Sequence, residues 1–275
     1  MVPGKASPRF VLKGNSLSTL CFRRIQTISE TTANIQRFYF YVQHITPAHF
    51  QTRRRAGVHT CNFAQTEVKM KTLAILSRKG GTGKTTLATH LSVAAERAGH
   101  TTALIDLDPQ SSASKWRDNR DGDTPAVIST HSERLQNILE LAEENGATFA
   151  ILDTAPHTEI AALGAARVSD MVLVPCKPSL IDLQAIGSTI DVVTLAKVPA
   201  HIVLNAVPAR GDLAGQARQA VDIYDIPCAP CEIGHRIGFV HAYNAGLTVQ
   251  EFEPKGKATN EINALYAYIA NEMGV

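Results

Sequence analysis

The residues with the clearest chemistry stand together at positions 78–86, in the run Arg-Lys-Gly-Gly-Thr-Gly-Lys-Thr-Thr. Its three glycines let successive backbone N–H groups turn inward around an anion, because no Cβ stands in the way. Lys84 is placed to reach the terminal phosphates of a nucleotide and Thr85 to ligate Mg²⁺, while a helix starting there adds the positive end of its dipole. The predicted nucleotide-binding residues of this loop are Lys79, Gly80, Gly81, Thr82, Gly83, Lys84, Thr85 and Thr86.

A second lysine, Lys79, precedes the glycine pair, so the run has the form K-G-G-x-G-K-[ST], the deviant Walker A motif. In this motif the sequence resembles the ParA/MinD group of ATPases, and the match extends over nearly all of residues 70–275. The resemblance implies that Lys79 reaches across an ATP-containing homodimer to the phosphates of the partner. The alternative for Lys79 is a solvated loop charge.

Carboxylates follow two further predicted strands. The apolar run at 102–105 ends in Asp106 and Asp108, and the run at 150–152 ends in Asp153. Carboxylates at this end of a strand face the ligand crevice of an open α/β sheet. The resemblance implies that Asp108 helps to position or activate the attacking water and that Asp106 supports the magnesium shell. It also implies that Asp153 is the Walker B aspartate that holds Mg²⁺. For Asp106 and Asp108 the alternative is a helix cap or a turn.

The resemblance thus makes Lys79, Lys84 and Asp108 the catalytic residues, with Thr85, Asp106 and Asp153 near the metal. It also suggests that Asn205, which ends the predicted strand at 201–204, reads the adenine edge. A turn at the end of that strand is the other interpretation of Asn205.

The C-terminal part from residue 234 resembles that of small partition ATPases. Candidates for contacts with DNA phosphates, without sequence reading, are Arg218, Arg236, Lys255 and Lys257. Ordinary solvated charges are the alternative, since residues 70–275 carry a net charge of −6.

Residues 1–69 differ from the rest in carrying a net charge of +8 and no helical period. We expect little stable structure there. A basic nucleic-acid arm, an import peptide and an upstream extension outside the natural protein are all compatible with the composition. We favour the last, because Met70 stands directly before the first predicted strand. No helix-turn-helix pattern is present in this segment.

From Met70 the pattern predicts a single α/β domain that ends at Val275, with a mostly parallel sheet flanked by helices. The predicted helices include one over 132–144, with Ser132 as its N-cap, and one over 183–196, and we interpret Trp116 as a packing residue. The resemblance implies a ParA-like ATPase that hydrolyses ATP with Mg²⁺, dimerises, binds nonspecific DNA and segregates a plasmid or chromosome with a ParB-like, centromere-binding adaptor. It implies a cytoplasmic, nucleoid-associated location.

Two other classes stay open. A MinD-like regulator bound to a membrane requires a basic amphipathic C-terminal helix, whereas residues 258–275 have an apolar stripe and no Lys or Arg. An iron–sulfur carrier would use Cys228 and Cys231, which we interpret as packing residues because a single C-x-x-C pair lacks two ligands. Five scattered cysteines do not suggest a disulfide framework.

Overall fold

The computed structural model describes residues 69–156 and 158–275, and the expectations for the segment before residue 69 lie outside this part of the chain. Its seven strands form one sheet of order β3-β2-β4-β1-β5-β6-β7, in which every neighbouring pair is parallel. The strands are β1 (Lys71–Ile75), β2 (Thr102–Asp106), β3 (Ala126–Ser129), β4 (Phe149–Asp153), β5 (Met171–Cys176), β6 (Ala200–Val207) and β7 (Cys228–Gly234). The α/β prediction is confirmed.

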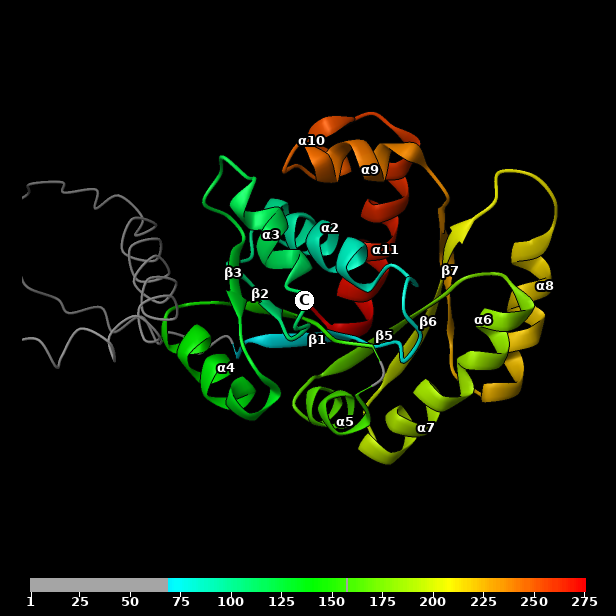
Figure 1. The fold of residues 1–275 in the computed structure, drawn as a ribbon, viewed down its shortest axis with the longest axis horizontal. Helices are drawn as coiled ribbons and strands as arrows, with labels where there is room; N and C mark the ends of the chain where they lie inside the picture. Colours follow the sequence, from blue (N-terminus) through cyan, green and yellow to red (C-terminus); the bar gives the residue numbers. More distant parts are fainter. Residues whose placement is uncertain (1–68, 157) are drawn as a thin grey trace, which may run out of the picture. The chain divides into compact units, whose positions relative to one another are not determined.

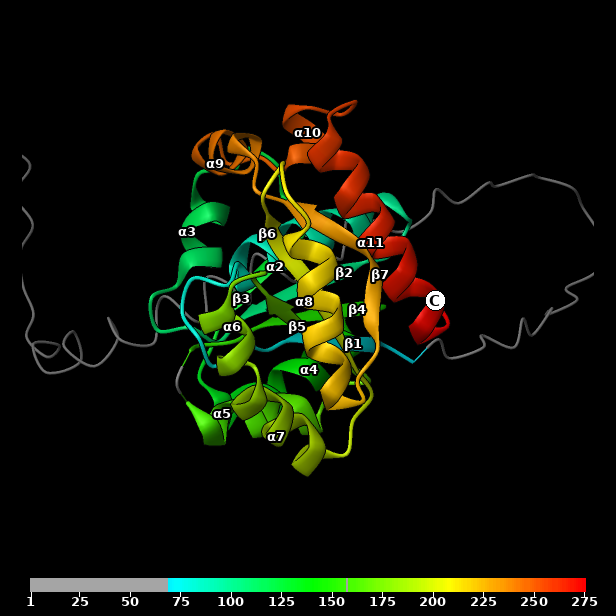
Figure 2. The same cartoon turned by 90° about the vertical axis from the view of Figure 1, so that its right-hand side faces the viewer.

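Helices cover both faces of the sheet, with α2 and α11 on one face and α4, α5 and α7 on the other (Figure 1). At the β7 edge, α8 packs against β6 and β7 (Figure 2). The helices are α2 (Lys84–Arg97), α3 (Ser112–Asp118), α4 (Leu135–Glu144), α5 (Glu159–Arg167), α6 (Leu180–Ala185), α7 (Gly187–Ala196), α8 (Leu213–Val221), α9 (Ile237–Asn244), α10 (Val249–Phe252) and α11 (Lys257–Met273), with 3₁₀ turns at Ser132–Arg134 and Asp222–Tyr224. Two covered faces explain the unbroken apolar runs of the central strands.

Two helices depart from the sequence expectation. The helix predicted over 183–196 is two helices, α6 and α7, and α6 begins earlier because the Ser179 side chain caps it by accepting the backbone N–H of Asp182. The helix predicted from Ser132 opens with a 3₁₀ turn, and Ser132 is the first residue of that turn, not a cap. Both errors concern helix ends, where local sequence is least decisive.

The core between β1, β4 and α2 includes the tryptophan that the sequence suggested was a packing residue. Trp116 is completely buried, and its indole N–H donates to the backbone oxygen of Leu247 at 3.2 Å. Arg120 lies over its ring and pairs with Glu251 on α10. Trp116 therefore joins α3 to the loop before α10.

The carboxyl ends of the central strands meet at one edge of the sheet. In the parallel register, Asp153 at the end of β4 is the partner of Ile75 on β1 and of Asp106 on β2. The hydroxyl of Thr154 donates to the carbonyl of Ile75 at 2.8 Å and fixes this edge. The segment that follows Ile75 is the predicted phosphate loop, so the fold brings the loop and both aspartates together.

Candidate active site

The predicted phosphate loop connects β1 to α2, and α2 begins at Lys84. Gly81 and Gly83 adopt left-handed conformations, with φ of 75° and 95°. Glycine adopts such angles without steric cost. The first helical hydrogen bond runs from the N–H of Leu87 to the carbonyl of Gly83 at 2.9 Å. The loop therefore leads directly into the positive end of a 14-residue helix, as the sequence predicts.

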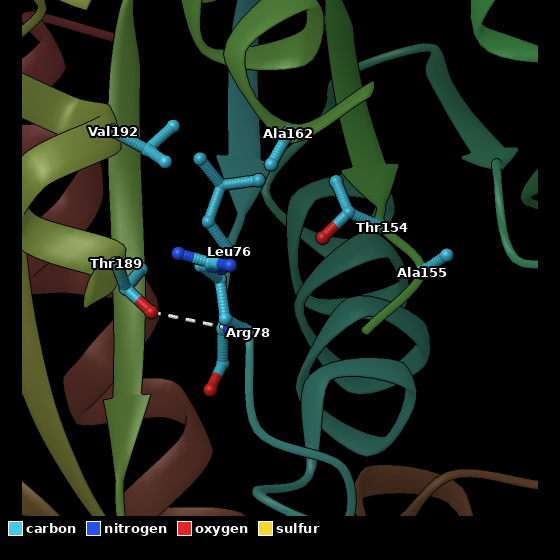
Figure 3. Close-up of a pocket in the computed structure, with 8 residues that line it drawn as sticks. Leu76, Arg78, Thr154, Ala155, Ala162, Thr189 and Val192 are labelled. Atoms are coloured by element: carbon cyan, nitrogen blue, oxygen red, sulfur yellow. Dashed lines mark hydrogen bonds between the residues drawn. The ribbon is translucent and has the colours of Figure 1, made fainter. Parts of the chain in front are cut away.

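The entrance to the loop is held by a hydrogen bond at a hollow that is lined in part by residues of α5 and α7 (Figure 3). The backbone N–H of Arg78 donates to the hydroxyl of Thr189 on α7 at 3.1 Å (Figure 3). Apolar side chains of Leu76, Ala162 and Val192 line the same hollow. The entry to the loop is consequently fixed to α7 as well as to β1.

The two lysines of the loop have different surroundings. Lys84 is 6% exposed, and its Nζ lies 3.5 Å from the carbonyl oxygen of Lys79. Burial lowers the pKa of Lys84, while the charges of Asp153 and Asp108 act in the opposite direction. The side chain of Lys79 is 32% exposed, and its Nζ lies 2.7 Å from a carboxylate oxygen of Asp182. Lys84 therefore lies inside the site, whereas Lys79 lies at its rim and pairs with α6.

Sequence reasoning missed Asp182, which is buried and accepts a very short hydrogen bond from the hydroxyl of Ser179. Burial works against its ionisation, but hydrogen bonds from Lys79 and Ser179 and the charges of Lys79 and Lys177 together lower the pKa of Asp182. The Ser-x-x-Asp spacing at the start of α6 is a capping pattern, and it is the signal that could have drawn attention to this residue.

The aspartates at the ends of β2 and β4 are fully buried but differently bound. One oxygen of Asp106 accepts the N–H of Asp108 at 3.1 Å, and the other accepts the N–H and the hydroxyl of Ser114 at 3.0 and 3.1 Å. Within the described residues, neither oxygen of Asp153 has a partner in full hydrogen-bond geometry, although the hydroxyl of Thr85 lies close enough to act on the carboxylate as a donor. Burial raises the pKa of Asp153 to about 7, with Thr85 and Lys84 opposing the rise and Asp106 adding to it.

This arrangement fits a divalent cation. A buried carboxylate without a partner is costly, so Asp153 requires a positive group or a hydrogen-bond donor at this point. Magnesium prefers oxygen ligands and takes only one or two carboxylates together with water and substrate phosphates. Among the described residues, no group of three or more His, Cys, Asp or Glu side chains could hold a metal ion by itself. Thr85, Asp106 and Asp153 are the residues that would hold the ion.

Asp108 lies at the partly exposed mouth of the site, where its Oδ1 accepts the N–H of Gln110 at 2.9 Å. This bond makes a turn of the kind that the alternative interpretation anticipates. The same position leaves the carboxylate accessible to water, which a water-positioning role requires.

Asn205 lies under the loop. Its amide nitrogen donates to the carbonyl of Thr82 at 2.6 Å, and its amide oxygen accepts the N–H of Ala206 at 2.9 Å. Both ends of the amide are therefore bound within the protein. Adenine reading by Asn205 stays a prediction, and the structure gives the residue a different contact.

The four candidate DNA contacts are not equivalent. Arg218 donates to the carbonyls of Ala229 and Pro230 on β7 at 2.6 and 3.2 Å. The guanidinium of Arg236 forms an ion pair with Glu261 of α11, with Nε within 3.0 Å of both carboxylate oxygens. Lys255 and Lys257, by contrast, are exposed at the start of α11. Only the two lysines present their charge outward.

Cys228 and Cys231 lie on β7, partly buried among apolar side chains. Burial raises the pKa of both thiols. The Nη1 of Arg218 lies 3.4 Å from the sulfur of Cys228. These surroundings agree with packing residues.

Among the described residues, no helix is both long enough and apolar enough to cross a membrane.

Comparison with known proteins places these observations in a family. Residues 73–249 match the model of the CobQ/CobB/MinD/ParA nucleotide-binding domain. The chain is 30% identical over 208 residues to the maintenance of carboxysome distribution protein A of Halothiobacillus neapolitanus, covering 72% of this chain and 95% of that protein. It is 26% identical over 260 residues to the IncC protein of Escherichia coli, covering 75% and 71%.

Among solved structures, the cell division ATPase MinD of Pyrococcus furiosus superposes with a TM-score of 0.61 at 20% identity, covering 74% of this chain and 99% of that one. At this identity the likeness shows a common fold. Together with the deviant phosphate loop at the carboxyl edge of a parallel sheet, the family match shows that the chain belongs to the ParA/MinD group of nucleotide-binding ATPases.

Proposed function

We propose that the chain is a ParA-like positioning ATPase, in which ATP joins two copies into a dimer and hydrolysis separates them. The observation that carries the proposal is the position of Lys79. Lys84 already serves the chain's own phosphate loop, and Lys79 lies at the rim of the same loop, paired with Asp182. A second, partly exposed lysine at this place is suited to the phosphates of a nucleotide in a facing subunit.

Hydrolysis follows from the arrangement of the chain's own groups. A water oxygen attacks the γ-phosphorus in line, the bond to the β–γ bridging oxygen breaks, and ADP and inorganic phosphate are released. Asp108 orients the water and receives its proton, while Lys84 and the loop N–H groups stabilise the charge that develops on the phosphate oxygens. A magnesium ion held by Thr85, Asp106 and Asp153 supplies further positive charge when bound.

We propose that the ATP-bound dimer binds DNA without sequence preference and so associates with the nucleoid. Lys255 and Lys257 are the charges available for phosphate contacts, since Arg218 and Arg236 are engaged within the protein. An adaptor bound to the cargo then stimulates hydrolysis. The similarity to the chromosome partitioning protein ParA of Caulobacter vibrioides, 26% identical over 159 residues, supports a replicon as cargo and a ParB-like adaptor.

The second candidate function concerns the cargo. Two similar proteins, each 30% identical, are named for the maintenance of carboxysome distribution. The same dimer cycle on DNA would then position a protein body in place of a replicon. The identity of the adaptor separates the two functions: one requires a protein that binds centromere DNA, the other a protein that binds the surface of the body.

Three single variants test the cycle. Lys79→Ala is expected to abolish ATP-driven dimerisation while monomer binding of ATP persists, whereas Lys84→Ala weakens nucleotide binding itself. Asp108→Ala is expected to bind ATP, dimerise and remain trapped, because the phosphate cradle is intact and the water-positioning carboxylate is lost. Sizing chromatography with ATP and a phosphate-release assay distinguish these outcomes. Dimerisation of Lys79→Ala, or hydrolysis by Asp108→Ala at the parent rate, would refute the mechanism.

DNA binding is tested separately by titrating a random-sequence duplex at several salt concentrations, with and without ATP. The expected affinity requires ATP and falls steeply with salt, because counterion release drives it. Replacing Lys255 and Lys257 with Gln should weaken binding and reduce the salt slope by about two charges. Replacing Lys197 and Arg167 together with Gln is the matched control, since it removes the same number of charges and both residues are exposed at the ends of α7 and α5, away from α11 (Figure 1). Equal DNA affinity with and without ATP would contradict the switch.

A further inference from the structure

Asn205 makes a buried contact with the phosphate loop. It is 7% exposed, and its amide nitrogen lies 2.6 Å from the carbonyl oxygen of Thr82, a residue 123 positions earlier. Thr82 is itself buried. The bond thus joins the end of β6 to the middle of the loop, across the site edge of the sheet.

The end of β6 is bent in a way that directs this side chain. The register between β6 and β7 shifts between Leu204 and Val207. Ala206 has a left-handed φ of 54°, a conformation that is unfavourable for a residue with a Cβ. The N–H of Ala206 donates to the amide oxygen of Asn205 at 2.9 Å. The amide nitrogen of Asn205 thus faces an acceptor, the carbonyl of Thr82, and its amide oxygen faces a donor, the N–H of Ala206. With the amide reversed, two acceptors would face each other at one end and two donors at the other.

The contact also constrains Gly83. A Cβ at this residue would lie 2.2 Å from the amide nitrogen of Asn205, and the φ of 95° independently favours glycine. In a trans peptide the C=O and the N–H point in opposite directions. Because Asn205 holds the C=O of Thr82, the N–H of Gly83 is directed away from β6. This N–H is one of the loop groups expected to surround the phosphates.

We propose that Asn205 is a positioning residue for the phosphate loop, acting on phosphate binding through the peptide between Thr82 and Gly83. The inference rests on nucleotide binding at this loop and concerns neither dimerisation nor DNA. The proposal distinguishes two roles that Asn205 could have, which are reading the adenine base and holding the phosphate loop. A residue that reads adenine affects only nucleotides with that base, whereas a residue that holds the loop affects every ligand with a diphosphate.

The test measures the affinities of the full chain for ADP, GDP and inorganic pyrophosphate, by competition against a fluorescent ADP analogue. Asn205→Asp keeps the shape but replaces the donor with a carboxylate oxygen facing the carbonyl of Thr82. A buried acceptor left without its donor predicts about a tenfold or greater loss of affinity for all three ligands, by a common factor. Asn205→Ala removes the donor without adding charge and is expected to lower the three affinities by a smaller common factor.

Asn145→Asp is the matched control. The amide of Asn145 donates to the carbonyl of Leu141 at 2.7 Å at the end of α4, which is the same kind of bond outside the loop. It should leave all three affinities unchanged, and thermal melting of each variant reports its folding.

A loss confined to ADP, with pyrophosphate unaffected, would overturn the proposal and make Asn205 a base reader. Unchanged affinities in Asn205→Asp would overturn it as well. Binding of ADP by the parent chain tests the nucleotide site on its own, so failure of that site is distinguishable from failure of the role of Asn205.

Discussion

Asp182→Asn tests the cycle at a residue of α6 that contacts the phosphate loop through its ion pair with Lys79. Lys79 pairs with Asp182 within one chain, so in the proposed dimer Lys79 must leave this partner before it can reach the facing nucleotide. The substitution keeps the size of the side chain and an acceptor for the hydroxyl of Ser179. It removes the charge that competes for Lys79.

The expected change in the dimer dissociation constant follows from the exposure of the ion pair between Lys79 and Asp182. Lys79 is about one-third exposed, so water screens the attraction and the pair is assigned about 1 kcal/mol. This energy corresponds to about a fivefold preference for the paired state, and a dimer must free two such lysines. Asp182→Asn is therefore expected to lower the dimer dissociation constant about 25-fold.

Sedimentation equilibrium with a non-hydrolysable ATP analogue measures this constant directly. Asp191→Asn is the matched control, because Asp191 is an exposed aspartate on α7 and its loss changes the net charge equally. The control should leave the constant unchanged. A weaker dimer in Asp182→Asn would show that Asp182 instead holds Lys79 in its productive position, and an unchanged constant would show that the pair does not compete with dimerisation.

Three further predictions concern the folded chain. Burial lowers the pKa of His90 from 6.5 to about 4, so the unfolded chain binds a proton that the folded chain rejects. The contribution of His90 to the free energy of unfolding should be constant above pH 7 and decrease by about 3 kcal/mol between pH 6.5 and 4, opposite in sign to the contribution of Asp153, whose pKa is raised. Urea unfolding at several pH values should therefore show that the stability of the parent chain relative to His90→Gln falls by this amount over that range. Gly83→Ala should lower the melting temperature by several degrees, whereas Gly80→Ala, where a Cβ meets no atom within 4 Å, should change it little. A chain starting at Met70, whose backbone N–H is already bound by Glu143 at 2.8 Å, should hydrolyse ATP at the rate of the full chain; loss of folding on truncation would contradict the expected domain boundary.

The parts of the site that follow strands could be predicted from sequence. Apolar runs mark buried parallel strands, and the ligand crevice lies at their carboxyl ends, so the loop at Lys84 and the carboxylates of Asp106 and Asp153 were placed correctly at one edge. The contacts that give Asp182 and Asn205 their proposed roles could not be predicted in this way. Each depends on a single contact between segments far apart in the chain, and periodicity contains no information about such contacts.

The candidate DNA residues illustrate the same limit. Composition treats every arginine as an available charge, yet Arg236 is paired with Glu261 at a separation of 25 residues, and Arg218 is bound to the carbonyls of the edge strand β7. An arginine has five donors that must be satisfied when it is partly buried. Whether a basic residue faces solvent is decided by these donors and their neighbours, which only the fold supplies.

The two buried aspartates show how similar sequence contexts acquire different tasks. Asp106 and Asp153 both end apolar strands and lie side by side in register. The carboxylate of Asp106 is bound by Ser114 at the start of α3, and α3 in turn is bound to the C-terminal segment through Trp116 and through the hydroxyl of Tyr243. Asp153 has no such partner in the described chain. Asp106 therefore also anchors the helix that joins the nucleotide site to α9 and α10, and of the two carboxylates proposed to hold the magnesium ion Asp153 is the one without such a partner among the described residues.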